Sequence, residues 1–578
     1  MLDKKYTYLI LAGLCFLVYA NSLPNAFVSD DIPAILENPY IISMRNYWAD
    51  PQGLLNSLSY RIAKFNVIPY HLISVILHFI NTLLVFLFLR LFFKTDASLL
   101  AAALFAVHPL HTEAVSWISG RPYLILAFFV LTTYLLYHRA TDPHMKDKNP
   151  AYVLYLSALA IFSYFIIGNI SFYFLFPFLI MFSDIIFNRW KKNWRLWIPF
   201  FLIMVIRLAL AKEVICARVS AVVLKTGWLE TWRNPVFYFI YSIFSHLWLL
   251  IFPARLTFYH DPIILRPLVM LCGLIAIFIF LCLLPFIFKR AKIILFGAVI
   301  FILFLAPTYS PLPVAFVVAE RYAYLPSIFL SIIAAFLYER YLKKAKGKQG
   351  IWIMVLFVFL ISAYGLRTIC RNKDWKDNAN FWKTTLKTSP YSVRAHNSIG
   401  TVYLQEGDIE AAIKEFDTAI RLDPAYDLTY NNRAGAYFYK GELDKAISDY
   451  DNAIKINPVY AEAYNNRGMA YKNKNEPDKA ISDYDNAIKI NPVYAEVYYN
   501  RANAYVTKGN LTGAISDYDM AIKINPYAAQ FYANRGAVYF LKQEYAKVRQ
   551  DIHKAETLGY KFNPEFINKL KKEIGKNQ

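Results

Sequence analysis

The chain has 578 residues, of which 57% are hydrophobic and 18% charged, and its formal net charge is +21. This length exceeds one compact domain, and so apolar a composition is typical of a membrane protein. The positive charge lies almost entirely in the first 390 residues, because residues 391–560 hold 20 basic and 22 acidic residues. Within that first part it sits in short loops between apolar segments. This is the charge pattern of a membrane topology and excludes nucleic acid as the partner.

Apolar runs near the ~20 residues needed to cross a bilayer recur through the first 371 residues. We expect helices at 6–23, 67–93, 97–118, 122–138, 151–167, 170–187, 195–211, 236–252, 266–288, 292–306, 322–341 and 351–371. The first is predicted to be an uncleaved span, since no small-residue cleavage site follows it. The five cysteines form no C-x-x-C pair, so neither a disulfide framework nor a metal site is expected.

Basic loops between these runs predict which ends face the cytoplasm. The loops are Lys4–Lys5, Arg90–Lys94, 138–148, Arg189–Arg195, Lys289–Lys292 and Lys343–Lys348. Between 195 and 289 the alternation requires an even number of crossings, but three apolar segments are present. Either 236–252 is re-entrant, giving eleven crossings, or 212–234 contains a short extra one, giving thirteen. Both alternatives place the first loop and residues 372–578 on the same, outer side of the membrane.

The first outer loop carries two adjacent carboxylates, Asp30 and Asp31, in the stretch Asn21–Pro39. A carboxylate pair beside a membrane domain is costly unless water, a metal or a substrate uses it. One chemical role is to remove a proton from an acceptor hydroxyl. A helix N-cap or a solvated turn is the structural alternative. The pair could also hold Mg²⁺ or Mn²⁺, so a divalent cation stays open as a cofactor.

Further polar clusters stand at the outer ends of the predicted helices. By parity all of them face the side of the carboxylates, which predicts one pocket at that membrane face. Imidazoles, carboxylates and arginines together suit a phosphate-bearing substrate that arrives laterally from lipid. For the His-x-x-His-x-Glu run, hydrogen bonds that orient the pocket wall are expected in preference to zinc. For Arg321, an internal ion pair with the preceding Glu320 is the structural alternative. The residues are His108, His111, Glu113, Arg121, His260, Asp261, Glu320 and Arg321.

After residue 371 the sequence becomes polar and repeats itself every 34 residues. Prolines keep this spacing at Pro390, Pro424, Pro458, Pro492 and Pro526. Small and aromatic residues repeat in step with them, which is the signature of tetratricopeptide repeats, each a pair of helices. After a linker at 372–390 we expect repeats at 391–424, 425–458, 459–492, 493–526 and 527–560, then a capping helix at 561–578.

An asparagine followed by an arginine recurs in four of these repeats. The asparagines are Asn432, Asn466, Asn500 and Asn534, followed by Arg433, Arg467, Arg501 and Arg535. An amide offers a donor and an acceptor, so such a ladder can hold an extended peptide backbone without reading its sequence. The alternative is that these side chains satisfy neighbouring repeats internally.

Five stretches carry a resemblance to a known family. They are DDIPAILENP at 30–39, YHLISVILHFIN at 70–81, HPLHTEAVSWISGR at 108–121, ERYAYLPS at 320–327 and RNKDW at 371–375. With the repeats, they make the chain resemble the transmembrane and tetratricopeptide-repeat glycosyltransferases, which include the eukaryotic O-mannosyltransferases and use the GT-C fold. The resemblance implies an all-α chain, with a GT-C-like membrane domain over 1–371 and an α-solenoid of five repeats.

The resemblance also implies a function. Such enzymes transfer a sugar from a polyprenyl-phosphate carrier to a protein hydroxyl or a glycan. Here it implies Asp30 or Asp31 as the base, and Arg121 and Arg321 as ligands of the carrier phosphate. The repeats would recruit a protein acceptor. The alternative is a catalytically silent membrane scaffold whose repeats recruit partners in an envelope complex. Because the chain ends KEIGKNQ, without a eukaryotic retention signal, a bacterial inner membrane is the expected location.

Overall fold

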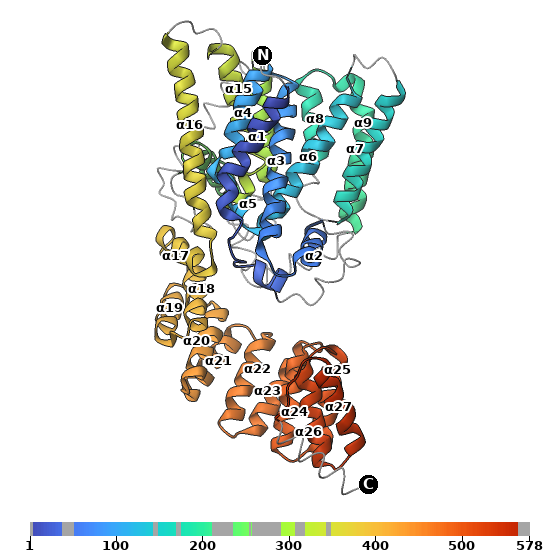
Figure 1. Cartoon of the computed structure of the whole chain (residues 1–578), viewed down its shortest axis with the longest axis vertical. Coiled ribbons are helices and arrows are strands. Elements are labelled where there is room, and N and C mark those ends of the chain that lie inside the picture. The colour runs from blue at the N-terminus through green and yellow to red at the C-terminus, as the bar shows by residue number, and fades with distance from the viewer. Residues whose placement is uncertain are drawn as a thin grey trace. The chain divides into compact units, whose positions relative to one another are not determined.

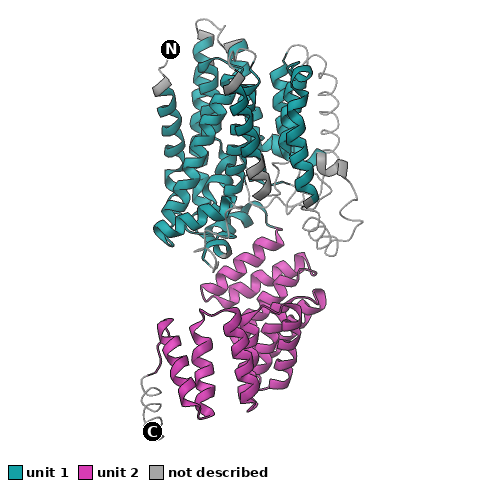
Figure 2. Ribbon diagram, turned by 90° about the vertical axis from the view of Figure 1, so that its right-hand side faces the viewer, with its two compact units in different colours: residues 1–390 teal, residues 391–578 magenta. Residues whose placement is uncertain are grey.

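The computed structural model describes residues 4–36, 51–142, 148–168, 175–210, 235–253, 256, 291–306, 318–342 and 348–563. The chain divides into two compact units, residues 1–390 and residues 391–578, which Figure 2 shows in different colours. Every regular element in the described ranges is a helix. The predicted all-α fold class is therefore confirmed.

The first unit is a bundle of long helices, most of them roughly parallel or antiparallel to one another (Figure 1). Its principal helices are α1 (Lys4–Tyr19), α2 (Pro51–Ala63), α3 (Val67–Arg90), α4 (Thr95–Val107), α5 (Thr112–Ser116), α6 (Arg121–Ala140), α7 (Lys148–Gly168), α8 (Phe176–Ile186), α9 (Trp190–Leu210), α12 (Pro235–Ile251), α14 (Lys292–Leu305), α15 (Ile328–Leu337), α16 (Lys348–Asn372) and α17 (Asn378–Thr388). Short 3₁₀ turns η4 (Pro109–His111), η5 (Ile118–Gly120), η8 (Glu320–Ala323) and η10 (Lys373–Trp375) connect several of them.

Three helices in the described ranges are long and apolar enough to cross a membrane: Val67–Arg90, Ile118–Ala140 and Gly350–Trp375. A fourth candidate is the bent pair α4 and α5, and several shorter apolar helices accompany them. These spans fit the prediction of a membrane domain. The stretches 212–234 and 266–288, which bear on the choice between eleven and thirteen crossings, lie outside the described residues, so that number stays a prediction.

The bend between α4 and α5 measures 50° and falls at His108–Pro109. Proline disfavours helical geometry in the residue before it, and His108 accordingly adopts extended backbone angles (φ −68°, ψ 125°). The His108 side chain then accepts a hydrogen bond from the Leu110 backbone N–H and caps the next turn. This break folds the polar run 108–113 into the unit, where all of its side chains are buried.

Aromatic side chains hold the helices of the first unit together. Phe88 of α3, Tyr134 of α6 and Phe296 of α14 form one cluster, with ring centroids 5.4 to 6.1 Å apart. Rings at such distances add to the stabilisation from apolar burial.

The second unit contains five consecutive helix pairs, as the 34-residue spacing predicts. They are α18 (Val393–Gln405) with α19 (Ile409–Leu422), α20 (Asp427–Lys440) with α21 (Leu443–Ile456), α22 (Ala461–Asn473) with α23 (Pro477–Ile490), α24 (Ala495–Thr507) with α25 (Leu511–Ile524), and α26 (Ala529–Leu541) with α27 (Tyr545–Thr557). The expected capping helix lies largely outside the described residues.

A small residue stands at the crossing of each pair, and the structure shows why. A Cβ atom built on Gly468 would lie 2.7 Å from the ring of Tyr484, which is fully buried against that backbone. Gly400 has the same relation to Phe416, at 2.6 Å. In these two pairs the close crossing therefore depends on a small residue on one helix and an aromatic ring on the other.

Candidate active site

The two carboxylates of the first loop lie in different surroundings. Asp30 is exposed, whereas Asp31 is fully buried. Asp31 Oδ1 accepts hydrogen bonds from the Ser119 backbone N–H at 2.7 Å and the Ser119 hydroxyl at 2.6 Å. Its Oδ2 accepts one from the Val28 backbone N–H at 3.3 Å. Asp31 thus ties the loop to η5, and Asp30 remains the carboxylate that faces solvent.

Burial raises the pKa of the Asp31 carboxyl from its usual 3.8 to about 6. The hydrogen bonds from Ser119 and Val28 and the charge of Arg121 oppose this rise. Asp31 is therefore mostly ionised at neutral pH, and both of its oxygens are engaged. This donor set does not fit one divalent cation shared by Asp30 and Asp31, because Asp31 is buried with both oxygens in hydrogen bonds while Asp30 is exposed.

The segment 369–378 holds the other side of the loop. The Asn21 side chain donates to the Ile369 carbonyl at 2.8 Å, and the Asn25 side chain to the Asn372 carbonyl at 3.0 Å. The Ala26 backbone N–H donates to the Lys376 carbonyl, and the Ser29 backbone N–H to the Asn378 side chain. The RNKDW stretch is thus part of the support for the carboxylate loop.

Asn372 is the most connected residue of this support. Its Nδ2 donates to the Val18 carbonyl at 2.8 Å and to Asn21 Oδ1 at 2.7 Å, and its Oδ1 accepts from the Ser116 hydroxyl at 2.8 Å. It is fully buried, at the point where α1, α5 and α16 meet.

We expect Asn372→Ala to loosen the carboxylate loop, because it removes all three of these side-chain hydrogen bonds. Each is worth about 1 kcal/mol, and the partners left buried raise the cost. Amide hydrogen exchange over residues 18–31 should become faster in the variant than in the wild type. The matched control is Asn380→Ala, since the Asn380 side chain bonds only Asp377 in an exposed turn. Equal exchange in both variants would mean that Asn372 does not support the loop.

The predicted wall residues of the 108–113 run form inter-helix contacts. His108 Nε2 lies 2.9 Å from the Leu250 carbonyl of α12, and His111 Nε2 lies 2.8 Å from the Ser327 hydroxyl. Glu113 pairs with Arg321: one carboxylate oxygen meets the guanidinium, and the other accepts from the Arg321 backbone N–H at 2.9 Å. These contacts join α5 to η8 across 208 residues.

The two candidate phosphate ligands differ in accessibility. Arg121 is fully buried and donates to Ser74 Oγ, Asn56 Oδ1 and the Tyr70 carbonyl at 3.2, 3.0 and 2.7 Å. Arg321 is 7% exposed, lies over the Trp117 and Tyr322 rings, and lines a small cavity with Tyr123. Arg321 is therefore the less enclosed of the two, and the cavity beside it, at about 10 Å³, has room for about one water.

Glu320 does not pair with the arginine next to it in the sequence. It is fully buried and meets Arg371 of α16 at 3.1 Å, and Arg371 also donates to Asp374 at 2.7 Å. Trp117 stacks on Trp375 beside this pair, with ring centroids 6.0 Å apart. His260 and Asp261 lie outside the described residues. Within the described ranges, no three His, Cys, Asp or Glu side chains gather where they could hold a metal ion.

The asparagine ladder of the repeats makes contacts between neighbouring repeats. Asn432, Asn466 and Asn500 each donate to the side chain of an asparagine 35 residues earlier, at 2.9 to 3.1 Å. Asn534 donates to the Tyr499 hydroxyl and to Asn503. Each of the four is half-buried, so one side of the amide is in contact with the preceding repeat while part of it reaches the surface.

The arginines that follow these asparagines form a second ladder between neighbouring repeats, as the alternative interpretation of the sequence held, but their aspartate partners were not predicted. Arg467 donates through Nε and Nη2 to Asp483 of its own repeat, and through Nη1 to Asp451 of the preceding one. The same arrangement recurs at the other three, Arg433, Arg501 and Arg535. The signal was available, because the triplet Asp-Tyr-Asp recurs at 449–451, 483–485 and 517–519 with the 34-residue spacing.

Comparison with known proteins agrees with both parts of the fold. Residues 400–438, 434–475 and 502–543 match the family described as TPR repeat, and residues 461–494 match the tetratricopeptide repeat. Over 476 residues the chain is 26% identical to Protein O-mannosyl-transferase TMTC3 of Homo sapiens, covering 72% of this chain and 51% of the relative. It is 25% identical to Protein O-mannosyl-transferase F38B6.6 of Caenorhabditis elegans, covering 72% of this chain and 63% of that protein. The predicted resemblance is confirmed.

The chain spans about half the length of the human relative. Among solved structures, the crystal structure of MamA is 28% identical and covers 28% of this chain and 94% of that protein, with a TM-score of 0.26.

Proposed function

Because this chain is related in sequence to the transmembrane and tetratricopeptide-repeat O-mannosyltransferases, we propose that it is a membrane glycosyltransferase of the GT-C class. It transfers a sugar from a polyprenyl-phosphate carrier to a serine or threonine hydroxyl of a protein. The proposal rests mainly on the different surroundings of the two carboxylates. Asp31 is buried and fixes the loop, and Asp30 is left exposed as the base.

The proposed reaction needs one proton acceptor and one leaving group. The acceptor hydroxyl oxygen attacks the anomeric carbon of the sugar while the bond from that carbon to the carrier phosphate breaks. The phosphate leaves with the bonding electrons, and Asp30 takes the hydroxyl proton. Arg321 binds the departing phosphate, while Glu113 orients the guanidinium. Arg121 acts indirectly, because it holds Tyr70 and Ser74 of α3 behind the loop.

Cells that produce the chain provide the test of this proposal. Mass spectrometry of their membrane and secreted proteins is expected to show hexose on serine and threonine residues. The same peptides should be unmodified in cells that produce equal amounts of the Asp30→Asn variant. Unchanged modification with both chains would contradict the proposed role. No modification with either would favour the membrane scaffold.

The repeats are proposed to recruit the protein acceptor through the asparagine ladder. Replacing Asn432, Asn466 and Asn500 with Ala removes amides worth roughly 0.5–1.5 kcal/mol each when they bond a ligand. Transfer to a long protein acceptor should therefore fall by about one to three orders of magnitude. A short soluble peptide, which reaches the membrane domain without the repeats, should be modified as before.

This experiment needs a folding control, because the same substitutions also break contacts between repeats. Circular dichroism and the melting temperature show whether the solenoid still folds. An equal loss on both acceptors would mean that the ladder only stabilises the repeats. Full activity on both would mean that acceptors do not follow this surface.

We propose an integral membrane location, in a bacterial inner membrane, with the repeats and Asp30 on the extracytoplasmic side. The basic residues Lys343–Lys348 at the start of α16 support this orientation, although residues 343–347 lie outside the described ranges. In intact cells an impermeant thiol reagent should label Asn475→Cys in the repeats and spare Lys346→Cys. Cys370 is exposed, so both variants are made on a Cys370→Ser background. Labelling of position 346 alone would reverse the orientation.

A further inference from the structure

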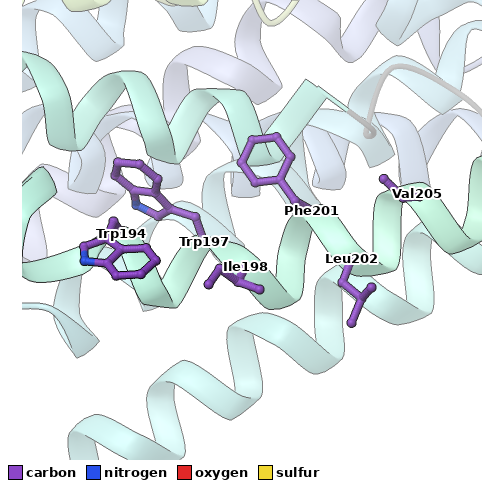
Figure 3. A pocket seen from close by; sticks show the side chains of 6 residues that line it. All are labelled: Trp194, Trp197, Ile198, Phe201, Leu202 and Val205. Atoms are coloured by element: carbon purple, nitrogen blue, oxygen red, sulfur yellow. The ribbon is translucent and has the colours of Figure 1, made fainter.

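An apolar groove runs along the outer surface of α9. Trp194, Trp197, Ile198, Phe201, Leu202 and Val205 line it, and Figure 3 shows these side chains along one stretch of the helix. Its volume is about 430 Å³. Ile198, Leu202 and Val205 are 50 to 57% exposed, so the groove opens outward and is not part of the core. From Trp194 to Val205 an α-helix rises about 16 Å, close to the ~15 Å of hydrocarbon in one leaflet.

Positive charge gathers at one end of this groove. The first turns of α9 read Trp190-Lys191-Lys192-Asn193-Trp194-Arg195, and both lysines and Arg195 are exposed. No acidic residue occurs in this stretch. Lys191 lies over the Trp190 ring at 5.8 Å, and Arg195 over the Trp194 ring at 5.3 Å. Tryptophan and basic residues in this arrangement are typical of the level of lipid headgroups.

A buried carboxylate fixes the end of α9 that carries these charges. Asp184 Oδ2 accepts from the Asn193 side chain at 3.1 Å, the Trp197 indole at 3.0 Å and the Tyr137 hydroxyl at 2.7 Å. Its Oδ1 lies 3.1 Å from Arg189 Nε. These contacts tie α9 to α8 and α6. The opposite face of the turn, with Lys191, Lys192 and Arg195, is thereby presented outward in a fixed orientation.

We propose that this groove and its basic end form a binding site for one anionic glycerophospholipid of the bilayer. One acyl chain lies along Trp194, Ile198 and Leu202, and the phosphate meets Lys191, Lys192 and Arg195. The charge complementarity and the one-leaflet length of the groove favour this occupant. The carrier lipid of the proposed reaction is not the occupant. Successive helices run in opposite directions, so α9 begins at the end of the unit that holds the N-terminus (Figure 1). The opposite end holds α2 and α5, beside which Ser119 binds Asp31 of the carboxylate loop.

Native mass spectrometry of the delipidated full chain tests this site. The purified protein is titrated with phosphatidylglycerol and phosphatidylcholine that have the same acyl chains. Wild type is expected to retain the anionic lipid preferentially. The preference should fall about fivefold for each charge removed in the series Lys191→Gln, Lys192→Gln and Arg195→Gln. Leu202→Trp, which fills the groove at an exposed position, should lower the retention of both lipids.

The matched control removes three exposed basic residues that lie on other elements at the same end of the unit. It carries Lys94→Gln, Arg139→Gln and Arg340→Gln, and it should keep the preference of the wild type. If all three substitutions of either set together prevent folding, the single variants at Lys191, Lys192 and Arg195 and the variant Leu202→Trp still test the proposal. An equal fall in the control, or no fall in the first series, would overturn the proposal. Competition by glycerol phosphate as strong as by the lipid would mean an anion site only. Displacement by polyprenyl phosphate at lower concentration would make the carrier the occupant.

Discussion

Arg321→Gln is expected to destabilise the membrane unit by about 3–5 kcal/mol, because it leaves Glu113 buried without its partner. Glu113 has no exposed surface and directs both carboxylate oxygens at Arg321. Glu113→Gln should be costly for the same reason, since it leaves the arginine uncompensated. The double variant replaces the ion pair with two amides that can bond each other, so it should recover most of the lost stability.

Activity separates the two roles of Arg321. If the guanidinium also binds the carrier phosphate, the double variant will fold and still transfer sugar poorly. Unfolding in denaturant and the transfer rate, measured on the same four proteins, give both quantities. Recovery of stability and of activity together would mean that Arg321 only holds η8 to α5. The phosphate would then require another ligand.

Replacing Asp30 with Asn is expected to lower the transfer rate by about 10²–10⁴-fold, the usual cost of removing a general base. The melting temperature should not change, because Asp30 is exposed. Asp31→Asn should behave differently. An amide cannot accept on both sides, so it loses hydrogen bonds from Ser119 or Val28 and loosens the loop. Its activity loss should accompany faster hydrogen exchange over residues 21–36. Full activity in Asp30→Asn would contradict the assignment of the base.

The helical repeats could be predicted from the sequence because the residues that define each helix pair lie close together in the chain. The spacing of 34 residues defines the helix pairs, and in the first four pairs a small residue stands opposite an aromatic ring, as Gly468 and Tyr484 show. The Asp-Tyr-Asp triplets carried an equally regular signal for the arginine ladder. The apolar runs similarly predicted the helices of the membrane unit, and the bend in one of them follows from Pro109.

The candidate site could not be resolved in the same way, because its contacts are distant in the sequence. Asp30 and Asp31 are chemically alike, and the contacts that distinguish them include two from Ser119, 88 residues away. Adjacency suggested a pair between Glu320 and Arg321, yet each meets a partner at least 51 residues away. The support of the loop by residues 369–378 likewise depends on α1 and α16 lying together.

The chain is proposed to move a sugar from a lipid-linked donor to a protein hydroxyl. The most direct measurement uses the purified chain in lipid nanodiscs with a serine-containing peptide and radiolabelled sugar, supplied either as polyprenyl-phosphate sugar or as nucleotide sugar. We expect label to reach the peptide only from the lipid-linked donor, in a linkage released by mild alkali, and Asp30→Asn to abolish the transfer. Label that stays on the lipid with every polyprenyl-phosphate sugar, or that comes equally from the nucleotide sugar, would contradict it.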